Sequence, residues 1–312
     1  MFWLSLLNLG LLLALWWSHL NLSEGRYWLA TLAAYIPQHP YGIPAGLLLL
    51  GALWRRTPGA VALNLFALGF WLLALMGFAL PKPAASGSPA LRLMSYNVRL
   101  DNADKVGRIA QAIRAERPDA LCMSEVFDWG AQQLSREFPG WYWRQAREVA
   151  IFSRHPLQNV VVRPMPGNPR QILEADLVIG DRRLKLVCVH QIAATLIDRR
   201  TRRPRFDTFL AEDRVRDDTT RLLLNVAAQS QHPVAVAGDF NTPPRVGVYR
   251  TMQAQMTDVW AARGFGLGFT YSSSRPLLRI DYIWTKGLGA GRVWVPRTGA
   301  SDHFPLVADL VW

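Results

Sequence analysis

The chain has 312 residues, half of them hydrophobic, and 35 basic against 23 acidic side chains give it a formal net charge of +12. Its only two cysteines, Cys122 and Cys188, lie within apolar runs; this excludes a disulfide-framework protein and a zinc site of paired cysteines, so we expect buried free thiols. Residues 1–83 hold four basic side chains and one acidic, and the remainder carries a net +9, which favours an anionic partner for that part.

The N-terminal third predicts a membrane domain over residues 1–80. Three hydrophobic segments, 1–20, 27–54 and 60–80, lack the polar stripe of a soluble amphipathic helix, and tryptophans lie mostly near their ends. Prolines interrupt the middle segment. A cleaved signal peptide is a weaker interpretation of the first segment, because a basic leader is missing and further hydrophobic segments follow.

The topology follows from Arg55 and Arg56, which lie between the second and third segments. The positive-inside tendency places them in the cytoplasm, so three spans would put the following domain on the extracytoplasmic side of a bacterial inner membrane. A re-entrant middle segment would invert this orientation. Residues 81–90, rich in Pro, Ser, Gly and Ala, predict a linker to a domain over residues 91–312.

The domain over residues 91–312 alternates short apolar strands with helices, which predicts a layered α/β sandwich with a mixed sheet. The expected helices cover about residues 106–117 and 208–229. A hairpin joins residues 174–179 to 184–190 through Gly180-Asp181. The remaining expected strands cover residues 91–98, 120–125, 149–153, 234–239, 279–284, 292–295 and 304–312.

Polar residues recur at the ends of these strands, where a layered fold gathers side chains from distant parts of the sequence. Each residue alone has an ordinary structural explanation, such as a turn or a buried histidine with satisfied hydrogen bonds. Oxygen ligands with two histidines and no cysteine suit Mg²⁺, or Mn²⁺, better than zinc. The set consists of Asn97, Glu125, His190, Asp239, Asn241, Asp281, Asp302 and His303.

The ordered motifs in this domain resemble those of the endonuclease/exonuclease/phosphatase superfamily, whose fold is DNase I-like. They are Ser95-Tyr-Asn-Val98, Ser124-Glu-Val126, Val189-His190, Gly238-Asp-Phe-Asn-Thr-Pro243, Ile280-Asp-Tyr-Ile283 and Ser301-Asp-His303. The resemblance implies a four-layered α/β/β/α sandwich with the site at one edge of its paired sheets. It also implies hydrolysis of a phosphoester without a covalent enzyme intermediate.

The resemblance further implies a role for each residue of the set. Glu125, with Asn97 beside it, would hold the metal, and Asp302 would assist at the metal or hold His303. Asp239 and Asn241 would position and activate the attacking water or contact the phosphate. His303, oriented by Asp281, would stabilise charge on the phosphoryl oxygens, and His190 would contact the phosphate or protonate the leaving oxygen. Family accounts differ over the general base.

Basic residues are the candidates for substrate binding: Arg170, and Arg199, Arg200, Arg202 and Arg203 in the loop after His190. This loop is either a solvated charge run, a clamp for nucleic acid phosphates, or an attachment to anionic lipid headgroups. Gln191 departs from the pattern of many superfamily members, which have an apolar residue there.

We therefore expect a membrane-anchored, metal-dependent phosphodiesterase with nuclease-like chemistry. The alternative is an enzyme acting on a phospholipid or lipid-linked phosphoester, and a catalytically inactive docking module would have no need for this complete set. The expected partners are the lipid bilayer and an anionic phosphoester, either nucleic acid or phospholipid. No protein partner can be inferred.

Overall fold

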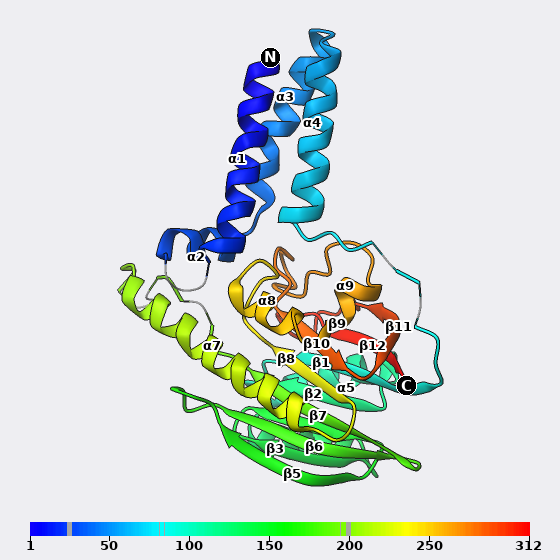
Figure 1. Ribbon diagram of the computed structural model, residues 1–312. Coiled ribbons are helices and arrows are strands. Elements are labelled where there is room, and N and C mark those ends of the chain that lie inside the picture. The colour runs from blue at the N-terminus through cyan, green and yellow to red at the C-terminus, as the bar shows by residue number, and fades with distance from the viewer. Residues whose placement is uncertain (24–26, 81, 84, 194, 198–200) are drawn as a thin grey trace.

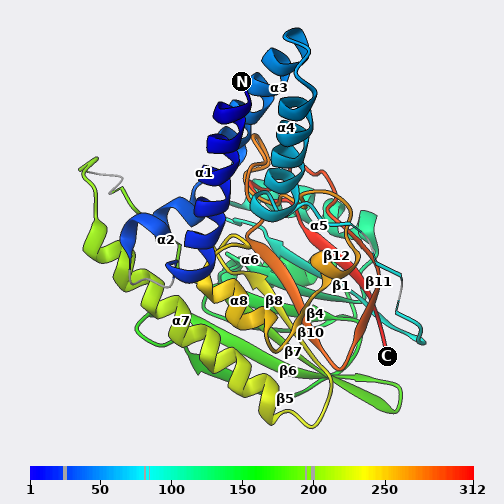
Figure 2. The ribbon, with the colours of Figure 1, turned by 45° about the horizontal axis from the view of Figure 1, so that its top comes forward.

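A computed structural model shows a helical bundle standing on a layered α/β domain (Figure 1), and describes residues 1–312 except 24–26, 81, 84, 194 and 198–200. The bundle consists of α1 (Phe2–Asn21), α3 (Ile43–Trp54) and α4 (Pro58–Phe70), and α4 continues into a π-helical turn, η2 (Trp71–Leu75). The short helix α2 (Trp28–Tyr35) lies across its base (Figure 2).

The middle hydrophobic segment, 27–54, is not one spanning helix. Ile36 precedes Pro37 and is extended, because a proline ring disfavours the helical conformation of the residue before it. The segment therefore divides into α2, a 3-10 turn η1 (His39–Gly42) and α3, which has only 12 residues. Among the described residues, two helical stretches, Phe2–Asn21 and Pro58–Leu75, are long and apolar enough to cross a membrane.

Two six-stranded sheets form the centre of the α/β domain. The first has the order β11 (Gly289–Trp294), β12 (Leu306–Val311), β1 (Pro89–Asn97), β2 (Ala120–Ser124), β4 (Val149–Ser153), β3 (Tyr142–Ala146). The second has the order β5 (Leu157–Pro164), β6 (Gln171–Ile179), β7 (Arg182–His190), β8 (Val234–Asp239), β10 (Asp281–Lys286), β9 (Thr257–Asp258). Each sheet combines parallel and antiparallel pairs, so the mixed sheet and the hairpin predicted from sequence are confirmed.

Helices cover the outer faces of both sheets, which gives the predicted order of four layers. On the first sheet lie α5 (Val106–Glu116), preceded by the turn η3 (Ala103–Lys105), and α6 (Asp128–Glu137). On the second lie α7 (Phe206–Gln229) and α8 (Gly247–Gln253), while α9 (Val259–Arg263) packs beside β10 and β11. Between the sheets lies a separate core built from alternate strand residues such as Leu93, Ile151 and Leu186.

The expectation of free thiols is wrong: Cys122 on β2 and Cys188 on β7 are joined in a disulfide, with their Cα atoms 5.5 Å apart. Both residues point into the core between the sheets. The sequence could not indicate this pairing, because the two cysteines are 66 residues apart and meet only when the sheets stack.

Candidate active site

The predicted polar residues meet at one edge of the sandwich because of strand direction. The parallel strands β1 and β2 end at Asn97 and Ser124, followed by Glu125, and the parallel strands β7 and β8 end at His190 and Asp239. Antiparallel β10 starts at Asp281, opposite Asp239 in the register. His303 lies just before β12, which runs antiparallel to β1 and so starts at the same edge.

Close packing of β7 on β8 explains Gly238, the residue before Asp239. A Cβ atom built on Gly238 would lie 1.8 Å from the carbonyl oxygen of Val189, and its φ of 142° is in the region that favours glycine. Only glycine lets the strands approach this closely. The pairing then holds His190 beside Asp239.

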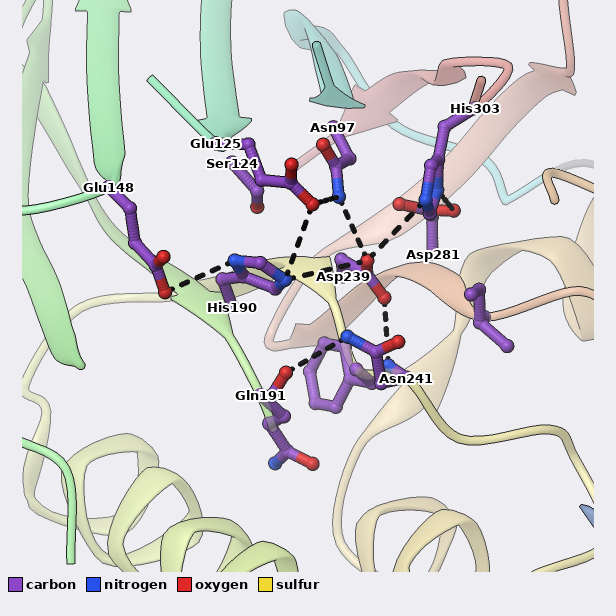
Figure 3. Close-up of polar contacts among 12 residues, drawn as sticks. Asn97, Ser124, Glu125, Glu148, His190, Gln191, Asp239, Asn241, Asp281 and His303 are labelled. Carbon is purple, nitrogen blue, oxygen red and sulfur yellow. Dashed lines mark hydrogen bonds and ion pairs between the residues drawn. The ribbon is translucent and has the colours of Figure 1, made fainter. Parts of the chain in front are cut away.

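Asp239 is the centre of the site (Figure 3). It is 1% exposed, and its Oδ2 atom lies 3.8 Å from Nε2 of both His190 and His303. Burial, and then the neighbouring Asp281 carboxylate, raise the pKa of Asp239 above its ordinary value. The arrangement produces a buried carboxyl with an increased affinity for a proton or a cation.

Each histidine has a second carboxylate on its other side. His303 Nδ1 is hydrogen-bonded to Asp281 Oδ2 at 2.8 Å, and His190 Nδ1 lies 3.2 Å from Glu148 Oε1. Burial alone would lower the pKa of His303, but the Asp281 carboxylate, with smaller effects of Asp239 and Asp302, outweighs it and raises that pKa from 6.5 to about 10. His303 is therefore cationic at neutral pH.

Two amide side chains connect the carboxylates and the strands. Asn97 Nδ2 donates to Glu125 Oε1 at 2.9 Å and to Asp239 Oδ2 at 3.0 Å. The backbone N–H of Asn241 donates to Asp239 Oδ1 at 2.8 Å, and Asn241 Nδ2 donates to the carbonyl oxygen of Gln191 at 2.9 Å. Glu125 and Asn241 have φ values of 56° and 48°, in the sparsely populated left-handed region that is common at functional sites.

Asp302 is partly exposed and lines the same cavity as Glu125. Its Oδ2 atom forms an ion pair with Arg99 at 2.7 Å. The three residues whose ligand atoms lie within 4.8 Å of one another are instead Asp239, Asp281 and His303. Sequence reasoning thus found the right edge of the fold, while the grouping within it comes from the structure.

Of the predicted substrate-binding arginines that the structure describes, Arg170 lies at the site, and Arg202 and Arg203 do not line its cavity. Arg170 lines the cavity in front of Asp239, but its guanidinium binds Glu148 at 2.7 Å and the carbonyl oxygen of Gln191 at 2.5 Å. Arg202 and Arg203 are exposed in the loop before α7 and are not among the described residues that line the cavity. Arg199 and Arg200 lie outside the described residues.

Sequence reasoning missed Glu148 and Tyr271. Glu148 precedes the buried strand β4, which starts opposite the end of β2, so a polar residue there lies at the same edge as Glu125. Burial alone would raise the pKa of Glu148, but His190, Arg170 and Arg147 together lower it, so it is anionic at neutral pH. Tyr271 lines the cavity, and its ring centroid lies 4.7 Å from that of His303. No motif marks either residue.

Comparison with known proteins gives one family and one fold. The Endonuclease/Exonuclease/phosphatase family matches residues 94–303. A humanized D. rerio TDP2 with 14 mutations is 17% identical, with a TM-score of 0.58, over 71% of this chain and 99% of that one. A mannosyl-6-phosphatase from Bacteroides thetaiotaomicron is also 17% identical, with a TM-score of 0.56, over 72% and 100%. A sequence search against curated proteins gives no significant match.

Proposed function

Since this chain belongs to the Endonuclease/Exonuclease/phosphatase family, whose members are phosphoester hydrolases, we propose that it is a membrane-anchored, divalent-metal-dependent phosphoester hydrolase with nuclease-like chemistry. The observation that carries the proposal is the central buried Asp239, which has a carboxylate-paired histidine on each side. Neighbours at 17% identity support the fold alone.

The geometry assigns a role to each side chain during attack of water on phosphorus. Asp239, whose pKa is raised, orients the water and accepts its proton as the new P–O bond forms. Cationic His303 donates to the phosphoryl oxygens, where negative charge develops. As the bond to the leaving group breaks, the leaving oxygen takes a proton from His190, which Glu148 holds in place. No covalent enzyme intermediate is required.

The donor set fits a divalent cation such as Mg²⁺. Glu125, Asp239 and Asp281 bring three carboxylates to one edge, and Asp281 Oδ1 is buried without a hydrogen-bond partner among the described residues. We propose that Glu125, with Asn97 beside it, holds the ion. When bound, the ion would neutralise phosphate charge and polarise the phosphorus centre.

Membrane anchoring is supported by the inverted polarity of the bundle. Only 28% of the residues in the apolar stretch of α1, and 22% of those in the apolar stretch of α4–η2, are buried. Large apolar side chains such as Trp3 and Leu47 face outward. Small residues such as Ala45 and Ala67 fill the helix contacts, and Asn64 Nδ2 donates to Ser5 Oγ inside the bundle at 2.7 Å. The 20 residues of α1 span about 30 Å, the thickness of a hydrocarbon core.

We propose an extracytoplasmic catalytic domain. The N-terminus and the α3–α4 turn, which carries Arg55 and Arg56, lie at the end of the bundle away from the α/β domain (Figure 1). The positive-inside tendency places that end in the cytoplasm. The disulfide between Cys122 and Cys188 fits an oxidising compartment.

The test is turnover of bis(p-nitrophenyl) phosphate and p-nitrophenyl phosphate by full-length protein in detergent micelles, with Mg²⁺, Mn²⁺ or excess EDTA. We expect turnover with either metal, none in EDTA, and none for Asp239→Ala in the presence of metal. The control is Asp309→Ala, which removes a partly exposed aspartate on β12 away from the site. Equal rates in EDTA and Mg²⁺, or an active Asp239→Ala variant, would contradict the proposal.

A further inference from the structure

The cavity in front of Asp239 has walls of two kinds. Its volume is about 810 Å³, within the usual range for small-molecule sites, and part of its lining is polar, formed by Glu125, His190, Asp239 and His303. Another part is an apolar wall, which we define as Leu32, Tyr35 and Ile36 of the N-terminal third with Leu196 and Ile197 of the α/β domain. Segments more than 150 residues apart thus form one surface.

We propose that the substrate is a membrane amphiphile whose phosphoester headgroup reaches Asp239 while its hydrocarbon part lies against the apolar wall. The inference rests on the proposed function, since it names the substrate class of the same site. Binding is favourable when the apolar atoms of a substrate displace water from the apolar wall. A cavity with both a polar and an apolar lining therefore favours an amphiphilic substrate.

The apolar wall is a fixed part of the catalytic domain. Tyr35 Oη donates to Asp213 Oδ1 at 3.0 Å in a buried contact, and Arg216 holds the same carboxylate at 2.9 Å while its guanidinium lies 5.0 Å from the centre of the Tyr35 ring. Arg245 Nε donates to the carbonyl oxygen of Ala34 at 3.3 Å. The N-terminal third therefore supplies part of the substrate cavity as well as the proposed anchor.

The position of α2 directs the cavity towards the bilayer. Helix α2 lies at the base of the bundle, between it and the α/β domain, as Figures 1 and 2 both show. Trp28 and Leu29 on α2 are exposed. The ring centroid of Trp28 lies 4.7 Å from that of Phe206, an exposed residue at the start of α7. At the rim of the cavity, Ile36 and Ile197 are 39% and 51% exposed. Apolar and aromatic side chains at this level suit a membrane interface.

The same cavity is poorly suited to nucleic acid. Among its described lining residues the arginines are Arg99, which is paired with Asp302, and Arg170, which is paired with Glu148. Nucleic acid binding depends on unneutralised cations along the phosphate backbone. The apolar wall offers neither a cation nor a track for a second phosphate.

The decisive experiment is a chain-length series with full-length protein and Mg²⁺. The probes are phosphatidic acids and phosphatidylglycerols with short acyl chains, used as monomers below their critical micelle concentrations, beside bis(p-nitrophenyl) phosphate and DNA. We expect kcat/KM to rise with chain length for one headgroup, by up to roughly fourfold for each methylene that reaches the wall. Monomeric probes separate binding to the wall from simple presentation at a membrane.

Variants locate the effect. Ile36→Asn and Ile197→Asn should lower the ratio of long-chain to short-chain kcat/KM at least tenfold, whereas Leu29→Asn, an exposed α2 residue outside the cavity lining, should keep the wild-type ratio. Thermal melts would show that each variant folds. A flat chain-length series with active bis(p-nitrophenyl) phosphate turnover, or DNA as the better substrate, would overturn this inference alone. Silence towards every phosphoester would overturn the proposed function, and this inference with it.

Discussion

The Asp281→Asn substitution tests whether His303 acts as a cation. With a pKa of about 10, His303 is about 99% protonated at pH 8 in the wild-type protein. Loss of the Asp281 carboxylate removes the largest cause that raises this pKa, so the pKa of His303 falls, while Asp239 and Asp302 still raise it. Activity that needs the cation should fall more at pH 8 than at pH 6, by roughly tenfold for each pH unit that the pKa of His303 drops below the assay pH. The sign follows from a raised histidine pKa: the charge is present below that pKa and is lost as pH rises through it.

The assay is the pH profile of kcat/KM on bis(p-nitrophenyl) phosphate with saturating Mg²⁺. The wild-type alkaline limb should lie near pH 10, and Asp281→Asn should move it to lower pH. Asp309→Asn is the matched control, because Asp309 also pairs with a cation, Arg92, but lies outside the site. A pH-independent loss in Asp281→Asn would mean a structural role, and an unshifted limb would refute a cationic His303.

Three further results are expected. Asp239→Asn should reduce kcat by roughly 10³-fold or more. The melting temperature should stay the same or rise, because burial beside a second carboxylate makes a charged Asp239 unfavourable in the folded protein. A lower melting temperature with retained turnover would contradict this prediction. Glu148→Gln should lower kcat roughly 10- to 100-fold with little change in KM, since His190 loses its oriented partner, and the check is steady-state kinetics with the melt as control. Alkylation of the denatured, unreduced protein should leave Cys122 and Cys188 unmodified by mass spectrometry, and labelling of both would disprove the disulfide.

The sequence alone determined the layers of the α/β domain and the polar residues that meet at one edge of it. Alternating apolar residues fix which face of a strand is buried, so the hairpin that ends at His190 and the strand that ends at Asp239 could be read directly. Polar residues at the ends of buried strands pointed to Asn97 and Glu125 beyond the apolar parts of β1 and β2, and to Asp281 at the start of β10. The hydrophobic character of the N-terminal third was also evident from the sequence.

Only the tertiary structure decided which of these residues touch. Strand register places His190 and Asp281 on either side of Asp239, and the antiparallel start of β4 adds Glu148, which no local pattern marks. The break before Pro37 is local, but the docking of α2 on α7 depends on the buried contact between Tyr35 and Asp213, 178 residues apart. The periodicity of apolar residues indicates which face of a helix or strand is buried, but the distances between elements depend on how the elements pack. The cavity in front of Asp239 and its apolar wall are formed by that packing, so the sequence pattern could not predict them.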